Sequence, residues 1–572
     1  MIGVYLDPVV INNKYLKQIK FTIDYLLNIS GYAWKYLDEH SVPAPGDVII
    51  YYSNGLPAHE SSAVLIRDYC IILIPFHKDF YLQGFFTGDN IKHNTKYLPG
   101  EEKIPYISNK RLQKEPINLY EYGEHKYCVF EFDLIGNTFL QLSDDDRNHI
   151  TKKDAQGDFD LNELGMNKDS ETPFINYYLT YLMNIIQVLV ENKGHWIIRK
   201  CLWPKNQPLA TLLSHNIDKL EKWNFFSFFL GLLEIIILFL TFHWKTLIRH
   251  LYSICKYLFK SEDLYWNFEQ ITAVERKHNV VSTWFIGINE NNKTYFDYHL
   301  EELVQEIAEI IRQGSEPSIL MVNEQKSIEE IRKALETMMT LASVKSQGIR
   351  HYNYYRDCEQ LDRIHHELGF KYDSTRRFKH KNGFYNGFAL PYPTFIYKNA
   401  NLFQTIYQLP ISFSADLLRL SKYRYLPYKE TIELIKQAVN QVIKVNGIFH
   451  FQLTNSLYYE IAYMPRLHQY LVEYFHEQNA YITSCSRLVQ WLHKRKNIKI
   501  IEEENRVIIK FYENIEQVTF EILGKRCISK VVGVNCNVQQ NFLYCEDVTK
   551  DSEVILELSP STANSSQVET AE

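Results

Sequence analysis

Four polar residues follow a short apolar run at residues 209–218, and their types could perform catalysis. They are Ser214, His215, Asn216 and Asp218. We expect the run to be a buried strand, because a short apolar stretch that ends in polar residues is typical of barrel enzymes, whose chemistry lies at the carboxyl ends of the strands. An imidazole and a carboxylate in such a place could hold a divalent metal or transfer a proton.

Further candidate residues follow later strands of the same kind. We expect strands at 280–287, 318–322, 348–352 and 447–453, alternating with helices at 299–312, 328–341, 358–368 and 428–445. This alternation predicts parallel strands joined by crossover helices, and therefore a barrel rather than a sandwich. The polar residues at the ends of these strands and of the segment 369–375 are Arg350, His351, Tyr352, Asp373 and Asn455.

Three of these segments resemble motifs of the polysaccharide deacetylases (carbohydrate esterase family four), in the branch whose first motif is Ser/Thr-His-Asp-Val-Asp. Residues 214–218 match that motif, except that Asn216 stands where the family has Asp. Residues 369–375, Gly-Phe-Lys-Tyr-Asp-Ser-Thr, match the family letter for letter. Arg350 fits the Arg-x-His-Tyr motif, but His351 comes one place early and Tyr352 takes the place of the histidine. The resemblance covers about residues 130–490. It implies an α/β fold with a distorted (β/α) barrel of the glycoside hydrolase/deacetylase superfamily.

The resemblance also implies roles for single residues. Removing an acetyl group from an amino sugar takes a divalent metal, a carboxylate base and an imidazolium acid. Asp218 is the one surviving metal-ligand position, because Val322 stands in place of the family's histidine ligand. Asn216 replaces the base and Thr454 replaces the acid, and neither an amide nor a hydroxyl can exchange a proton readily near pH 7. Three of the four roles are therefore vacant.

We therefore expect a polysaccharide deacetylase-like protein of carbohydrate metabolism that is a glycan-binding or regulatory pseudoenzyme. No catalytic residue, metal or other cofactor is expected. Two alternatives stay open. One is an active metal-dependent carbohydrate N-deacetylase, a hydrolase of C–N amide bonds that uses zinc or a similar metal. In that case the nearby residues His351, Asn323, Glu324 and His450 are available to take over the vacant roles. The other is a structural or interaction scaffold. The expected groove residues are His215, Asn216, Asp218, Arg350, His351, Tyr352, Asp373 and Asn455.

Composition limits the classes of partner and compartment. The chain has 572 residues and a net charge of -6, which gives no electrostatic case for a nucleic-acid partner. Its 9 cysteines include no Cys-x-x-Cys pair, which favours buried thiols in a reducing compartment. The first residues do not resemble a secretory signal. These features predict a cytoplasmic protein. The sequence does not indicate its oligomeric state.

One segment could change that prediction. Residues 225–242 are almost wholly apolar but contain Glu234, and residues 243–260 have the pattern of a basic amphipathic helix. Three interpretations stay open for the hairpin at 224–260: it packs on the barrel, it lies on an anionic membrane surface as a peripheral contact, or 225–242 spans a bilayer.

The chain divides into five predicted regions. Residues 1–128 form a small α/β domain in which 63–66 and 69–74 are expected to pair as strands, and 129–205 form a connecting helical region. Residues 206–496 form the barrel, and 497–558 form a short antiparallel β module. Residues 559–572 are expected to be a disordered tail. The acidic cluster Asp144, Asp145 and Asp146 in the connecting region is expected to be a solvated helix end.

Overall fold

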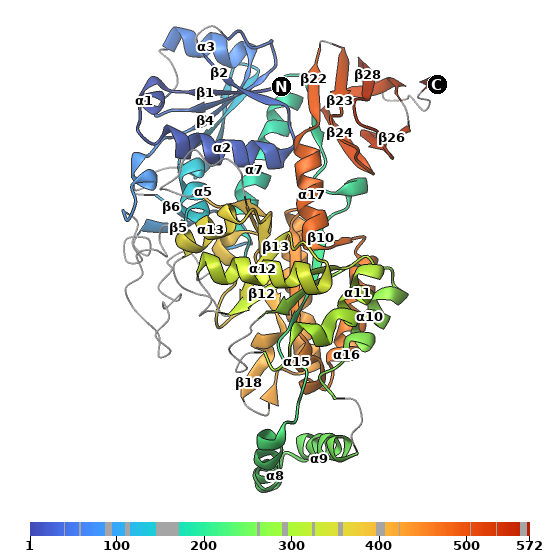
Figure 1. Ribbon diagram of the computed structural model, residues 1–572. Helices are drawn as coiled ribbons and strands as arrows, with labels where there is room; N and C mark the ends of the chain where they lie inside the picture. The colour runs from blue at the N-terminus through green and yellow to red at the C-terminus, as the bar shows by residue number, and fades with distance from the viewer. Residues whose placement is uncertain are drawn as a thin grey trace.

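The computed structural model is a mixed α/β protein with a central curled sheet (Figure 1). It describes residues 1–571 apart from a set of short segments. The segments outside the description are 39–40, 56–58, 86–93, 109–114, 145–170, 260–262, 289–295, 323–326, 353–357, 396–405, 422–423, 504, 534 and 561–568, together with residue 572.

The amino-terminal region contains a six-stranded sheet in the order β2-β1-β3-β4-β8-β7. All neighbouring strands are parallel except β7 and β8. The prediction that residues 63–66 form a strand is wrong, because they lie in the helix α3 (His59–Asp68). The parallel neighbours β3 and β4 need a crossover between them, and α3 supplies it. The strands are β1 (Ile2–Leu6), β2 (Trp34–Leu37), β3 (Val48–Tyr52), β4 (Cys70–Ile74), β7 (Ile117–Tyr122) and β8 (His125–Phe130), and the helix α2 (Leu16–Ser30) follows β1 in the chain.

The central sheet has ten strands and curls into a half-barrel. Its path is β15-β16-β14-β13-β12-β11-β10-β20-β17, and β21 pairs with β10. All the pairs are parallel except β15 with β16. The strands are β10 (Ala210–Ile217), β11 (Thr283–Gly287), β12 (Glu316–Val322), β13 (Gly348–Tyr352), β14 (Tyr372–Asp373), β15 (Tyr392–Pro393), β16 (Tyr407–Gln408), β17 (Phe413–Ser414), β20 (Ile448–Thr454) and β21 (Tyr481–Thr483).

Helices cover the outer surface of this sheet (Figure 1). Their positions confirm the predicted alternation to within a few residues, because each helix shows its apolar face in the 3.6-residue period of the sequence. The helices are α10 (Phe268–Lys277), α11 (Val304–Arg312), α12 (Ile328–Ala342), α13 (Cys358–Glu367), α14 (Tyr428–Lys444) and α16 (Met464–Glu477), and the short α15 (Asn455–Glu460) follows β20.

The carboxyl-terminal region consists of two sheets of short, mainly antiparallel strands. One has the order β22-β23-β28-β25-β29, and the other has the order β26-β27-β24-β9. The strand β9 (Trp196–Lys200) comes from the region before the barrel and pairs with β24, so the β region includes a strand that is distant in sequence. β29 (Glu569–Ala571) lies in the segment where a disordered tail is predicted. The other strands are β22 (Lys499–Glu502), β23 (Arg506–Lys510), β24 (Val518–Gly524), β25 (Arg526–Val532), β26 (Cys536–Gln539), β27 (Phe542–Cys545) and β28 (Glu553–Pro560).

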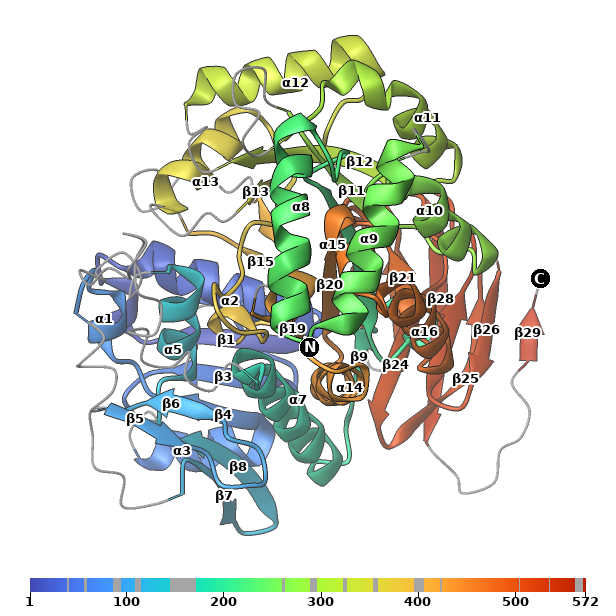
Figure 2. The same ribbon diagram turned by 90° about the horizontal axis from the view of Figure 1, so that it is seen from below.

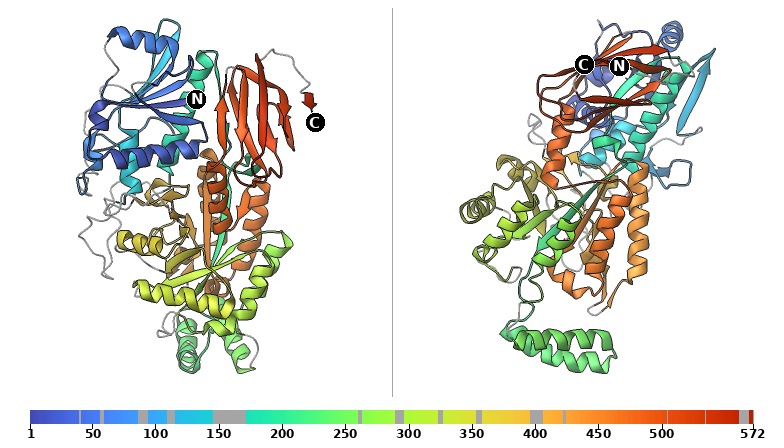
Figure 3. Two further views of the ribbon diagram at one scale, coloured as in Figure 1. Left: turned by 45° about the horizontal axis from the view of Figure 1, so that its top comes forward. Right: turned by 90° about the vertical axis from the view of Figure 1, so that its right-hand side faces the viewer.

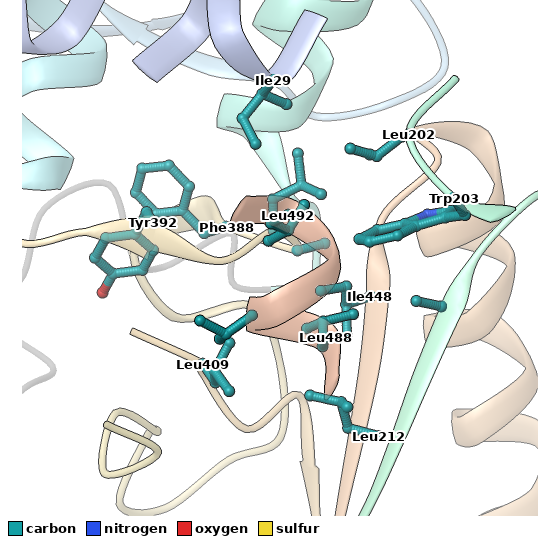
Figure 4. Packing of buried hydrophobic residues seen from close by; sticks show 14 of the residues in the cluster. Ile29, Leu202, Trp203, Leu212, Phe388, Tyr392, Leu409, Ile448, Leu488 and Leu492 are labelled. Carbon is teal, nitrogen blue, oxygen red and sulfur yellow. The ribbon is translucent and has the colours of Figure 1, made fainter. Parts of the chain in front are cut away.

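The helix α17 (Cys485–Lys496) lies where the three regions meet. Its Leu488 and Leu492 pack among residues from the amino-terminal region, the connecting region and the barrel, including Ile29, Trp203 and Leu212 (Figure 4). The buried Arg495 donates to the backbone oxygens of Asn28, Ile29, Lys200 and Cys201. One helix therefore ties the three regions to a shared core.

The connecting region contains α5 (Leu134–Leu142) and α7 (Phe174–Asn192). Asp144 is not solvated, contrary to the prediction for the acidic cluster, because it is 4% exposed and its carboxylate lies 3.2 Å from Nε of Arg376. The free-energy cost of burying this carboxylate is offset by the buried guanidinium of Arg376. Asp145 and Asp146 are outside the described residues.

Residues 225–258 form a hairpin of two helices, α8 (Phe225–Leu240) and α9 (Trp244–Leu258). The hairpin lies across one end of the barrel and protrudes from the rest of the chain (Figures 2 and 3). Its contacts with the barrel include Arg249, which donates to the backbone oxygens of Tyr459 and Glu460. No helix among the described residues is long and apolar enough to cross a membrane.

Candidate functional site

A cleft of about 1300 Å³ lies between the carboxyl ends of the barrel strands and the α8–α9 hairpin. Asp218 and Thr454 reach it from the ends of β10 and β20, and Tyr352 reaches it from the end of β13. The rest of the lining is rich in tyrosines and cations. These residues are Lys222, Arg249, Tyr265, Arg377, Lys379, Arg419, Arg424, Tyr425, Tyr428, Tyr459 and Tyr463.

Asp218 is held in place by the first residues of α15. Ser456 Oγ donates to its carboxylate at 2.8 Å, and its backbone N–H donates to Oδ1 of Asn455 at 3.0 Å. Burial raises the pKa of Asp218 to about 7, and the nearby charge of Asp416 adds to the rise, although the hydrogen bond from Ser456 opposes it. A carboxyl group that titrates near neutral pH in a cleft could donate or accept a proton.

Asp416 is a second carboxylate in the cleft, and sequence reasoning missed it. Thr454 Oγ1 donates to Asp416 Oδ1 at 2.7 Å, Gln452 Nε2 donates to Oδ2 at 3.3 Å, and Nη2 of Arg377 lies 3.6 Å from Oδ2. Thr454 is therefore occupied as a hydrogen-bond donor. The only signal for Asp416 in the sequence is that it follows β17, which is too short to be recognised from its pattern.

Asn216 and Arg350 do not line the cleft but lie buried behind it, 2% exposed each. Arg350 Nη1 donates to Oδ1 of Asn216 at 2.7 Å, and Nη2 donates to the hydroxyls of Ser214 and Ser374 at 2.9 and 2.7 Å. The guanidinium also lies 3.8 Å from the ring centre of Phe285. Within the described part of the chain no carboxylate pairs with Arg350, and burial lowers its pKa to about 9.

His215 points to the opposite side of the sheet, because successive strand residues face opposite ways. Its Nε2 lies 2.7 Å from Oε1 of Glu275, and Nε2 of His468 lies 3.7 Å from the same oxygen. Ser282 Oγ donates to the other carboxylate oxygen at 2.7 Å. Burial alone would raise the pKa of Glu275, but the charges and hydrogen bonds of His215 and His468 outweigh it and lower that pKa to about 2.

His351 and Asp373 belong to a third buried group, for the same reason of strand alternation. His351 Nε2 lies 3.1 Å from Nε2 of His365, whose Nδ1 lies 3.3 Å from Oδ2 of Asp373. Arg376 Nη2 donates to Asp362 at 2.7 Å within the same group. Burial and the neighbouring His365 lower the pKa of His351 to about 3. These side chains form an internal charge network and not a wall of the cleft.

The predicted groove residues are thus divided among five places. Asp218 and Tyr352 line the cleft, whereas Asn455 lies beneath it and is 1% exposed, with its Nδ2 donating to backbone oxygens of Lys219 and Tyr265. The remaining residues, His215, Asn216, Arg350, His351 and Asp373, lie in the three buried groups just described. Sequence spacing located the strand ends, but it did not assign each side chain to a face.

Two sets of side chains among the described residues have the composition and spacing to hold a metal ion. They are His215 with Glu275 and His468, and His365 with Asp362 and Asp373. Arg376 already supplies a cation to the second set. Neither set includes Asp218, and Val322 is a buried apolar residue paired with Tyr352. The described residues around Asp218 therefore do not fit the metal of a deacetylase, and the alternative residues Asn323 and Glu324 lie outside the part of the chain that the structure describes.

Comparisons with known proteins find similarity only in structure. No protein-family model and no curated protein matches this chain. A candidate polysaccharide deacetylase from Mycobacterium smegmatis aligns with 51% of this chain and 93% of its own length, at 15% identity and a TM-score of 0.34. An allantoinase aligns with 51% of this chain and 92% of its own, at 12% identity and a TM-score of 0.35. A CE4 family pseudoenzyme from Bacillus anthracis aligns with 50% of this chain and 66% of its own, at 10% identity and a TM-score of 0.25. At these TM-scores the function has to be inferred from the residues of this chain.

Proposed function

We propose that this chain binds a glycan in the cleft without removing its acetyl groups. The observation that carries the proposal is the position of Asn216. Its amide is buried as the acceptor for Arg350, so it cannot accept a proton from a water molecule in the cleft. The chemistry expected of a deacetylase therefore lacks its base, although an open polar cleft remains.

The lining of the cleft suits a sugar. Carboxylates, cations and hydroxyls such as Asp218, Arg377 and Thr454 can hydrogen-bond to sugar hydroxyl groups, which both donate and accept. Tyrosines such as Tyr352, Tyr425 and Tyr459 offer a flat apolar surface and a polar tip. A few convergent polar groups beside aromatic rings are typical of a small-molecule site.

A second candidate function is hydrolysis with Asp218 as the acid–base group. The pKa of about 7 favours this alternative, because such a carboxyl can transfer protons at neutral pH. Against it stand Asn216 and Val322, which remove the base and the metal ligand that the deacetylase mechanism requires.

Calorimetric titration of the full chain with chito-oligosaccharides tests the proposal. We expect saturable binding that Tyr352→Ala and Asp218→Ala weaken about tenfold, the effect of losing about 1.4 kcal/mol. Tyr122→Ala is the matched control, because Tyr122 is 49% exposed on the amino-terminal sheet, away from the cleft. Absence of binding to any acetylated glycan would contradict the proposal and favour the scaffold alternative.

A further inference from the structure

The α8–α9 hairpin has one face turned inward and one outward. Leu238, Leu247 and Ile254 are buried between the helices and the adjoining chain, and Trp223 Nε1 donates to Oγ of Ser253 at 3.2 Å. Glu234 and Leu238 line the cleft, and Glu234 lies 4.0 Å from Nδ1 of His250. The central acid of the apolar run is therefore on the inner side of the hairpin.

The outward face is almost wholly apolar. Phe259 is 85% exposed, Phe225 77% and Phe242 73%. Soluble proteins rarely expose contiguous apolar patches of this extent, and such patches mark surfaces that are covered in use. The other exposed large apolar residues of the hairpin are Phe229, Leu230, Leu232, Leu233, Ile236, Ile237, Phe239, Leu240, Trp244, Ile248, Leu251, Tyr252, Tyr257 and Leu258.

The charge of this segment differs in sign from that of the whole chain. Residues 225–258 contain three basic residues, Lys245, Arg249 and Lys256, and one acid, Glu234, whereas the whole chain has a net charge of -6. Arg249 and Glu234 both line the cleft, so their charges offset each other on the inner side of the hairpin. A basic segment with an apolar face complements the anionic surface of a bilayer. Two copies of the same basic hairpin would instead repel each other across a twofold contact.

The dimensions of the hairpin agree with a position in the interface. A helix of 16 residues such as α8 is about 24 Å long, which is shorter than the ~30 Å hydrocarbon core of a bilayer. The two helices lie side by side across the end of the barrel, so they present one broad surface (Figure 2). Such a surface can be buried in the headgroup region without any helix crossing the membrane.

We propose that the outward face of the α8–α9 hairpin docks in the interfacial layer of an anionic lipid bilayer. The apolar residues of the outward face enter the boundary between headgroups and acyl chains, and the net positive charge of the hairpin attracts the phosphates. The cleft, on the inner side of the hairpin, then lies within about one helix diameter, roughly 10 Å, of the headgroups. This proposal does not depend on which ligand the cleft binds.

Flotation of the full chain with lipid vesicles tests the proposal. We compare vesicles of equal parts phosphatidylglycerol and phosphatidylcholine with vesicles of phosphatidylcholine alone. The test variant is Leu233→Glu with Ile236→Glu, because these residues are 60% and 58% exposed on α8. The matched control is Met339→Glu with Leu434→Glu, at 54% and 45% exposed positions on α12 and α14. Thermal unfolding establishes that both variants fold.

We expect the wild-type chain and the control to float with the anionic vesicles and the test variant to bind them at least about tenfold more weakly. High salt should weaken the binding of the wild-type chain by screening its electrostatic part. Equal flotation of wild type and test variant would overturn the proposal, and equal binding to neutral vesicles would overturn its anionic requirement. The proposal would also be overturned if the wild-type chain did not bind vesicles but formed a dimer without lipid, and if the test variant did not form that dimer.

Discussion

Asn216, near the end of β10, and Asp218, just beyond it, are two residues apart, yet they belong to different kinds of site. Asn216 is sealed behind the cleft, where its amide oxygen accepts a hydrogen bond from the buried Arg350. Asp218 lies beyond the end of β10, is partly exposed to the cleft and has a pKa of about 7. Polar residues at the strand ends therefore have two different roles in this barrel. Buried groups bonded to one another hold the barrel together, whereas a carboxyl group with free access can meet a ligand.

The largest effect on stability is expected from removing the buried hydrogen bonds of Arg350. Arg350→Ala leaves Asn216, Ser214 and Ser374 without their donor and creates a cavity beside Phe285. We expect the free energy of unfolding to fall by about 3–5 kcal/mol, measured by urea denaturation. Arg312→Ala is the control, because Arg312 is 78% exposed, and we expect a change below about 0.5 kcal/mol. A loss below about 1 kcal/mol for Arg350→Ala would show that the buried network is not structural.

A smaller and pH-dependent effect on stability is expected from Glu275, which contacts His215 on the outer side of β10. The pKa of Glu275 is about 2 in the folded chain and 4.5 when unperturbed, so its ionised form stabilises the fold above pH 4.5 and this contribution is lost as the pH falls toward 2. We expect Glu275→Gln to lower the free energy of unfolding by about 3 kcal/mol at pH 7 and by clearly less at pH 3. Equal losses at the two pH values would contradict the lowered pKa of Glu275.

Ionisation of Asp218 in the cleft should destabilise the fold, in contrast to ionisation of Glu275. The pKa of Asp218 is raised from 3.8 to about 7, so the folded chain holds the proton more tightly than the unfolded chain. The resulting penalty is absent below pH 3.8, grows between pH 3.8 and 7, and is complete above pH 7. We expect Asp218→Asn to raise the free energy of unfolding by about 2 kcal/mol at pH 8, since solvent at the cleft screens part of the effect, and to leave it unchanged at pH 3.5. Destabilisation at pH 8 would refute the raised pKa.

Most of the barrel was predictable from the sequence, because strands and helices alternate and each helix has a regular apolar period. The predicted helices at 328–341 and 358–368 match α12 and α13 almost to the residue. Two kinds of feature were not predictable. The face on which His215 or His351 lies depends on the register of the sheet, and a strand as short as β17 gives no pattern, so Asp416 was missed. The pairing of β9 with β24 joins residues more than 300 positions apart, and no local signal indicates it.

The most direct test of the central claim is an acetate-release assay on the purified full chain with chito-oligosaccharides and added zinc. Binding without hydrolysis predicts no acetate above the protein-free blank, both for the wild-type chain and for Asp218→Ala, under conditions in which calorimetry shows the glycan bound to the wild-type chain. Acetate release by the wild-type chain that disappears in Asp218→Ala would contradict the account, because it would show that Asp218 takes part in hydrolysis although the amide of Asn216 cannot act as a base.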